Sequence, residues 1–218
     1  MDNMIKQSGT FFDDNESYLI RQEGLPSTCS YVVTYLSGDD VCSISPLGYM
    51  TELTSGTLIG MDYEIRTGNG RVEIRSSTGV VFRLGKHSSF SIKKTIAGEC
   101  PVYYGNVFIS NDEGQQVLGG GKYRTSCYVP GHTNLLIKPV TDTIDCYYVL
   151  NYDINIVEFD ENGRQFFIDH ADQYTKLELS FDDSMPMRKK YTTLSKHDLT
   201  DDEITELYTD WVSPVFWR

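Results

Sequence analysis

The chain has 218 residues, of which 31 are acidic and 19 are basic, so its formal charge is −12 at pH 7. This length can bury a sizeable core without disulfide or metal support, and one folded unit plus a short appendage is the simplest organisation. The acidic balance argues against nucleic acid as a partner, because binding to a phosphate backbone depends on clustered Lys and Arg side chains.

Residues 1–30 are predicted to form an N-terminal arm. The opening stretch, MDNMIKQSGTFFDDNESY, is acidic and lacks the charged and apolar regions of a secretory leader, and no apolar run has membrane-spanning length. The sequence as written therefore predicts a cytoplasmic protein without a membrane span. An exported protein whose leader has been removed would look the same, so the cell envelope or the extracellular space stays an alternative.

An all-β unit is predicted over residues 31–180. Short alternating runs rich in Val, Ile, Tyr, Phe and Thr are interrupted there by Gly, Asn and Asp at intervals typical of β-hairpins. In one such run Val80, Phe82 and Leu84 alternate with Arg83, which is expected to face outward. Further strand-length segments are residues 101–110, 122–129, 134–140, 146–153 and 154–159. The glycine-rich stretch NDEGQQVLGGG is interpreted as a loop.

Residues 68–71 (GNGR) have the composition of a phosphate-binding loop. A phosphate cradle needs successive backbone N–H groups at a helix start or in a backbone nest, whereas strand patterns flank this segment on both sides. We therefore interpret it as a hairpin turn or bulge.

Residues 181–198 are predicted to be a linker, and residues 199–218 a capping helix with an aromatic tail. Thr200 and Glu203 have the spacing of a capping box, with Leu199 placed to form a hydrophobic staple. The apolar positions at helical spacing are Ile204, Leu207, Tyr208 and Trp211. Their shared face is expected to cover a sheet surface or edge before Pro214 ends the helix.

The pattern from residue 31 to about residue 179 resembles the FecR-like domain. The resemblance rests on residues 36–38, on the Gly- and Thr-containing segment 56–67, and on residues 79–88, where Gly79 leads through Leu84 to Ser88. The family's central "Thr-Pro" to "Gly-Thr" segment is altered, since Ser126 follows Thr125 and His132 separates Gly131 from Thr133. The resemblance implies an antiparallel β-sandwich or a β-solenoid-like module.

In its namesake setting the FecR-like domain is a periplasmic sensor that reports the state of an outer-membrane receptor to a sigma-factor regulator through a membrane helix. This sequence matches the β module without that helix and without the anti-sigma segment. The resemblance therefore implies a binding or scaffolding unit, with no catalytic residues to transfer.

Tyrosine is the most unusual part of the composition, with 15 residues, two of them at positions 103 and 104 and two at 147 and 148. Adjacent strand positions face opposite sides of a sheet, so one ring of each pair is expected to point outward, where it can contact a sugar face or a partner strand. The candidate contact residues, with the C-terminal aromatics included, are Tyr103, Tyr104, Tyr147, Tyr148, Trp211, Phe216 and Trp217.

The histidines and cysteines carry no recognised motif. The four histidines form no H-x-H or H-x-x-x-H pair, so a metal site would require distant strands to converge. The five cysteines form no C-x-x-C pair and are expected to be small buried hydrophobes, with one or two disulfides as an alternative. Cys127, His132 and Asp145 can be drawn together as a catalytic set, but no oxyanion loop accompanies them. We predict no catalytic residues, no metal and no cofactor.

Together these features predict a non-enzymatic binding or scaffolding module that acts through protein or polysaccharide contacts, in signalling or cell-envelope assembly. The alternatives are carbohydrate or small-ligand binding through surface tyrosines, and a hydrolase or metal enzyme. The sequence leaves the partner and the oligomeric state open.

Overall fold

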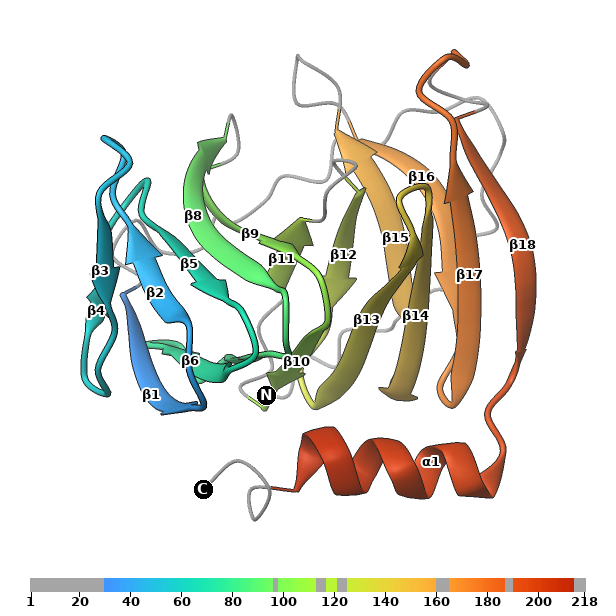
Figure 1. Cartoon of the computed structure of the whole chain (residues 1–218). Coiled ribbons are helices and arrows are strands. Elements are labelled where there is room, and N and C mark those ends of the chain that lie inside the picture. The colour runs from blue at the N-terminus through green and yellow to red at the C-terminus, as the bar shows by residue number, and fades with distance from the viewer. Residues whose placement is uncertain are drawn as a thin grey trace, which may run out of the picture.

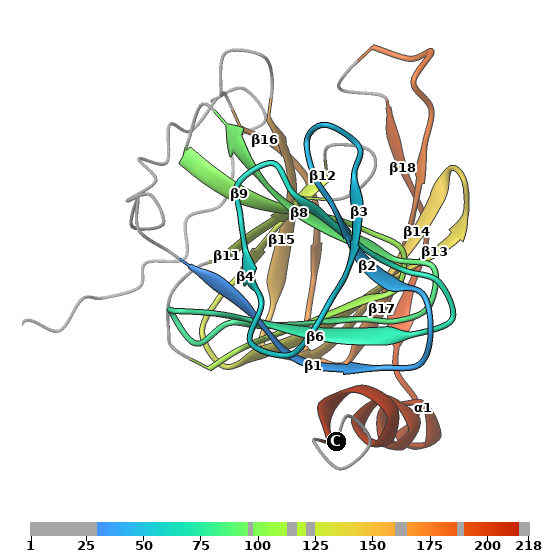
Figure 2. The same cartoon turned by 60° about the vertical axis from the view of Figure 1, so that its left-hand side comes forward.

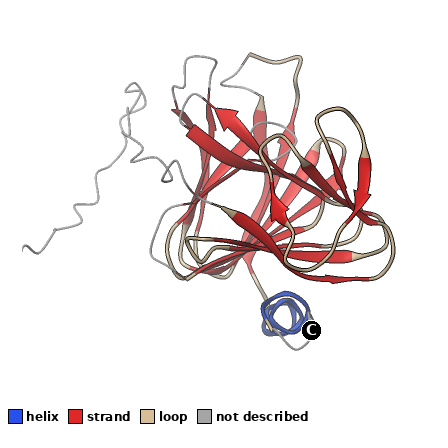
Figure 3. Ribbon diagram, turned by 90° about the vertical axis from the view of Figure 1, so that its left-hand side faces the viewer, coloured by secondary structure: helices blue, strands red, loops and turns tan. Residues whose placement is uncertain are grey.

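The computed structural model describes residues 30–95, 98–112, 117–120, 125–159, 165–186 and 190–213. In this part of the chain the strands form two sheets of nine strands each, which pack face to face (Figures 1 and 3). The predicted all-β sandwich with a C-terminal helix is therefore confirmed. No helix in the described residues is long and apolar enough to cross a membrane.

The first sheet, called sheet A, carries the C-terminal helix on its outer face. Its strands, in spatial order, are β18 (Tyr191–Asp198), β17 (Thr175–Phe181), β14 (Ile144–Asn151), β13 (Thr133–Thr141), β10 (Val107–Asn111), β7 (Val81–Leu84), β6 (Arg71–Ser76), β1 (Tyr31–Ser37) and β4 (Leu58–Ile59).

The second sheet is called sheet B. Its strand order, like that of sheet A, runs from C-terminal strands at one end to N-terminal strands at the other. Its strands, in spatial order, are β16 (Gln165–Ala171), β15 (Ile154–Phe159), β12 (Thr125–Val129), β11 (Val117–Gly120), β9 (Gly98–Tyr104), β8 (Ser89–Thr95), β5 (Glu64–Thr67), β2 (Val41–Ile44) and β3 (Met50–Glu52). The described pairings are antiparallel except for β9 with β11, which is parallel.

The chain passes repeatedly from one sheet to the other, and many of these crossings contain a residue with positive φ. The non-glycine examples are Asp40, Asp62, His87, His132, Tyr152 and Tyr174, with φ between 54° and 64°. The left-handed conformation costs an L-residue roughly 1–2 kcal/mol, so it is adopted where a short connection has to turn sharply between layers. Two of the four histidines thus sit at corners of the sandwich.

The core lies between the two sheets. The aromatic rings of Phe82 and Phe90 pack with centroids 5.0 Å apart, and Tyr31 lies 5.8 Å from Phe90. Val72 and Ile74 also enter this core, as their alternation along β6 predicts. The two sheets bury these side chains against each other.

The C-terminal helix α1 (Asp201–Leu207) lies across the outer face of sheet A and continues into a π-helical turn, η2 (Tyr208–Val212) (Figures 1 and 2). The predicted capping box is present, because the Thr200 side chain accepts from the N–H of Glu203 and the Glu203 carboxylate accepts from the N–H of Thr200. The apolar residues that the helix packs against on the sheet are Phe108, Leu136 and Leu150. The helix therefore covers a sheet surface. Arg83 faces outward, as predicted, but is buried beneath it.

Three predictions about strands need correction, namely the linker, the glycine-rich loop and the single strand over residues 101–110. Residues 181–198, predicted to be a linker, contain β18, which pairs with β17 at the edge of sheet A. Its side chains are mostly polar and are largely exposed on both faces, so it lacks the alternation by which a half-buried strand is found. The glycine-rich stretch interpreted as a loop contains β11, in which Gly119 and Gly120 pair with Cys127 and Ser126.

The segment 101–110 forms two strands in place of one. Gly105, with φ 88°, ends β9 in sheet B and redirects the chain into β10 of sheet A. Apolar alternation continues across the corner because both strands face the same core, which hides the crossing from a pattern search.

The GNGR segment is also a crossing, from β5 in sheet B to β6 in sheet A, and not a hairpin, because β5 and β6 do not pair. A Cβ atom added to Gly70 would lie 2.8 Å from the backbone oxygens of Ser37 and Asp39. The N–H of Gly68 donates to the carbonyl of Asp40 at 2.8 Å. These glycines allow two corner turns to touch, which is a packing role.

Candidate functional site

The paired tyrosines do alternate between the two faces of their strands, but this places half of them out of reach. Tyr103 and Tyr147 are 3% and 2% exposed in the core, so their inclusion among the candidate contacts is wrong. Burial, followed by the nearby Cys127 thiol, raises the pKa of Tyr103 well above its usual value. Tyr104 is 39% exposed and stays a candidate contact.

The outward ring of Tyr148 is covered rather than free. It packs with the side chains under α1, and the ammonium groups of Lys138 and Lys176 lie 5.3 and 5.6 Å from its ring centroid. Trp211 belongs to the same cluster, 6.4 Å from the ring of Phe108. These two aromatic residues hold the helix on the sheet. Phe216 and Trp217 lie outside the described residues.

A different apolar surface lies at the end of the sandwich formed by β3 and β4. Leu47, Tyr49 and Met50 occupy the β2–β3 turn and the start of β3, and are 83%, 71% and 70% exposed. Leu58 of β4 is 71% exposed. We call these four residues the apolar end surface. Their large hydrophobic side chains are exposed to water. β3 and β4 lie at the end of the molecule where both sheets stop (Figures 1 and 2).

Both sheets have an edge strand at this end. β3 is the last strand of sheet B and β4 the last of sheet A, and within the described residues no further strand pairs with either. Edge strands offer unpaired N–H and C=O groups to another chain, and natural proteins blunt them by keeping them short or by placing charged side chains or proline on them. β3 and β4 are only three and two residues long, and β3 ends at exposed Glu52. The exposed side chains of Met50 and Leu58, and not a long open edge, are therefore what favours association here.

Sequence reasoning missed this surface, although a signal for it exists. Leu47, Tyr49 and Met50 surround Gly48 in a tight turn, where the N–H of Gly48 donates to the carbonyl of Ser45. Turns of this kind usually carry polar residues. Apolar side chains at a glycine turn were therefore the detectable anomaly, but only the fold shows that the turn leads into the edge strand of sheet B.

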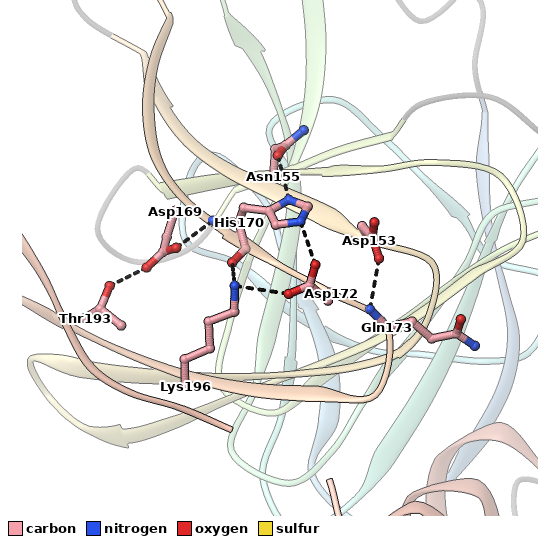
Figure 4. Close-up of polar contacts among 8 residues, drawn as sticks. All are labelled: Asp153, Asn155, Asp169, His170, Asp172, Gln173, Thr193 and Lys196. Carbon is pink, nitrogen blue, oxygen red and sulfur yellow. Dashed lines mark hydrogen bonds and ion pairs between the residues drawn. The ribbon is translucent and has the colours of Figure 1, made fainter. Parts of the chain in front are cut away.

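The opposite end of the sandwich brings together polar side chains that are distant in the sequence. Asp153, His170 and Asp172 each place one potential ligand atom within 4.8 Å of the other two, the one such group in the described part of the chain. Asp153 follows β14, while His170 and Asp172 lie at the end of β16. Figure 4 shows His170 in contact with Asp172, with Asp153 beside them.

The ring of His170 is held on both sides by oxygen atoms. Its Nδ1 lies 3.1 Å from Oδ1 of Asn155, and its Nε2 lies 3.0 Å from Oδ1 of Asp172. The strand register places Asn155 directly opposite His170, so the β15–β16 pairing builds the first of these contacts. Asp153 Oδ1 accepts from the N–H of Gln173 at 3.0 Å, which joins two corner turns.

Side chains also connect this group to β18, the edge of sheet A. Lys196 donates to the carbonyl of His170 at 2.7 Å and lies 3.3 Å from Oδ2 of Asp172. Thr193 donates to Oδ2 of Asp169. Oδ1 of the same carboxylate accepts from the N–H of His170 at 2.7 Å. Burial opposes ionisation of Asp172, but hydrogen bonds from His170 and Lys196 outweigh it and lower the pKa of that carboxyl.

The cysteine and histidine combination drawn from the sequence does not form a site of this kind. Cys127 is buried in the core, where burial raises the pKa of its thiol to about 12, and Tyr103 hydrogen-bonds to it. His132 is exposed at a corner beside the ring of Tyr152. Cys42, Cys127 and Cys146 are free thiols, while Cys29 lies outside the described residues.

Comparisons with known proteins give limited similarity. No family model matches the chain. No curated protein matches it. Two solved structures do, both entitled crystal structures of a "putative anti-sigma factor" from Parabacteroides distasonis ATCC 8503. Each is 13% identical with a TM-score of 0.47, and they cover 66% and 65% of this chain. The chain spans 63% and 62% of their lengths. The FecR-like relationship thus stays a resemblance.

Proposed function

We propose that this protein is a non-enzymatic binding module whose apolar end surface contacts a partner protein. The observation that carries the proposal is the exposure of Leu47, Tyr49, Met50 and Leu58 at the end where both sheets have edge strands. Leu47, Tyr49 and Met50 are neighbours in one turn, and neighbouring exposed apolar side chains mark interaction sites more often than isolated ones do.

The geometry supports docking of an extended segment along an edge. A partner strand would gain main-chain hydrogen bonds from β3 or β4, and side-chain contacts from the apolar residues beside it. Tyr49 and Met50 are residue types enriched at the centres of protein interfaces. The formal charge of −12 disfavours acidic partners, so the segment is expected to be neutral or basic around its apolar positions. The FecR-like resemblance supports signalling or envelope assembly as the setting.

The test is site-specific photo-crosslinking in the cells that produce the protein. A photoreactive phenylalanine analogue replaces Tyr49 in one variant and Val140 in the control, since Val140 is 57% exposed on a strand end away from the apolar end surface. We expect a discrete crosslinked protein partner from position 49 and none from position 140.

A second pair of variants checks that the apolar contact is required. Leu47, Met50 and Leu58 are replaced together by Asp, and the matched control carries Asp at Val140, Met185 and Leu194, which are exposed apolar residues elsewhere. Recovery of the crosslinked partner should be lost only in the first variant. Equal recovery with both variants, or crosslinking that does not depend on position, would refute the proposal.

Polysaccharide binding is a second candidate, favoured by the exposed rings of Tyr49 and Tyr104. Flat aromatic faces stack against sugar rings, and Tyr adds a hydroxyl for hydrogen bonding. A glycan array would show binding that falls when both tyrosines are replaced by Ser. An array without specific binding would remove this candidate and leave the protein-binding proposal untouched.

A further inference from the structure

We propose that Asp153, His170 and Asp172 form a binding site for a divalent transition-metal ion at the end of the sandwich where β16 and β18 are the edge strands. The proposal is independent of the apolar end surface, which lies at the opposite ends of both sheets. It assigns a chemical role to the convergence of three side chains that the sequence alone keeps apart (Figure 4).

The donor set determines which metal fits. One imidazole nitrogen with two carboxylate oxygens suits borderline ions such as Zn²⁺ and Co²⁺, which accept His and Asp together, whereas Mg²⁺ and Ca²⁺ prefer all-oxygen sites. Metal–nitrogen and metal–oxygen distances near 2.0–2.2 Å put ligand atoms no more than ~4.4 Å apart. The ligand atoms here lie within 4.8 Å. Small rotations of the two exposed carboxylates would close this difference.

The orientation of His170 suits coordination through Nε2. Because an amide oxygen only accepts hydrogen bonds, the contact from Asn155 Oδ1 places a proton on Nδ1. Nε2 faces the Asp172 carboxylate and donates a proton to it, so a metal that binds Nε2 would displace that proton. An outer partner that fixes the ring and its tautomer in this way is typical of histidine ligands. Asn155 would act as a positioning residue.

Lys196 is the feature that competes with a metal. Its ammonium lies 3.3 Å from Oδ2 of Asp172, while His170 faces the other oxygen, Oδ1. The metal position and the ammonium therefore use different oxygens of one carboxylate. The Lys196 charge should weaken metal binding without preventing it. A cluster that serves only to join β16 to β18 would instead need Lys196 and would bind no metal.

The experiment titrates the full chain, free of any affinity tag, with Zn²⁺ by calorimetry and with Co²⁺ by visible absorption. We expect one ion per chain and Co²⁺ bands of a His- and carboxylate-bound ion, with Mg²⁺ and Ca²⁺ unable to displace it. His170→Asn and Asp153→Asn should each weaken binding at least about tenfold, and Asn155→Ala about 10- to 100-fold. His132→Asn, an exposed histidine at a left-handed corner that Asn tolerates, is the matched control.

Lys196→Met separates the two roles of the cluster. For a metal site it should tighten Zn²⁺ binding, by roughly twofold to fivefold, because it removes an exposed neighbouring charge. Circular dichroism and thermal unfolding of each variant confirm that it is folded. The proposal is overturned if the wild-type chain binds neither ion, if His170→Asn binds as tightly as His132→Asn, or if Lys196→Met weakens binding.

Discussion

Glu73 and Arg83 form a buried ion pair across two neighbouring strands, with Nε of Arg83 2.8 Å from Oε2 of Glu73. The residues are directly opposite each other in the β6–β7 register, on the outer face of sheet A, and their side chains are 12% and 9% exposed. Arg83 also donates to the carbonyl oxygen of Val212 at 3.1 Å and to that of Trp211. The guanidinium therefore satisfies carbonyl groups at the end of the helix, where no further turn can bond them.

Replacing Arg83 by Ala should destabilise the protein strongly. It leaves the Glu73 carboxylate buried without its cation and the helix end without a donor, a change that costs ~3–5 kcal/mol for buried pairs. Unfolding in guanidinium chloride measures the loss in the free energy of unfolding. Arg66→Ala is the control, because the Arg66–Glu64 pair has the same 2.8 Å contact but side chains 57% and 32% exposed. Its cost should be at most ~1 kcal/mol. Similar losses for both variants would show that the Glu73–Arg83 pair is not a buried anchor.

Thr200→Ala should remove about 1 kcal/mol from the free energy of unfolding, since it deletes the side-chain acceptor of the capping box. The same substitution at Thr205, an exposed position inside α1, should be neutral or slightly stabilising because Ala is the better helix former. Urea unfolding of both variants gives the comparison. Equal effects would mean that the cap contributes nothing specific.

Gly105→Ala should cost ~1–3 kcal/mol through backbone strain, with a steric cost in addition. Its φ is 88°, and a Cβ atom there would lie 2.7 Å from the Cα of Ser88 and 2.8 Å from the carbonyl oxygen of His87. Gly48→Ala is a close control, because Gly48 has φ 84° but nothing within 4 Å of the added atom. The difference between their unfolding free energies isolates the clash, and the absence of a difference would contradict it.

The free energy of unfolding should fall at high pH because of Cys127. Burial raises the pKa of this thiol from 9.0 to about 12. Between these values the unfolded chain loses the thiol proton while the folded chain keeps it, so stability declines by up to ~1.4 kcal/mol per pH unit. Below pH 9 this contribution is constant.

Unfolding measured between pH 8 and pH 11 tests the sign and the source of this decline. Cys127→Ala should make the slope shallower, and the remainder comes in part from Cys146, whose pKa burial raises to about 11. The variant also lowers stability by leaving a small cavity. Val129→Ala, which truncates a fully buried neighbour on the same strand without removing a titratable group, should keep the wild-type slope. An unchanged slope in Cys127→Ala would exclude the thiol as its cause.

Local chemistry in the sequence correctly predicted the parts of the fold that neighbouring residues control. The alternation of Val72 with Ile74 follows from the period of a strand, and the capping box at Thr200 follows from a spacing of three residues. Alternation also predicts that one ring of each tyrosine pair points into the core. It does not say that Tyr103 and Tyr147 are the inward ones. Strand β18 escaped prediction because an edge strand with polar faces has no alternation to detect.

By itself, the sequence determined that this chain is β-rich, where many strands alternate, and how its last helix begins, because each depends on residues a few positions apart. Only the tertiary structure decided which sheet each strand joins and that α1 covers Arg83. It also decided that Leu47 and Met50 are exposed beside an edge strand, and that the side chains of Asp153 and His170 lie close together. Strand alternation fixes which face a side chain takes but not its neighbours. Those neighbours come from pairings between segments far apart in the chain, and the candidate sites depend on them.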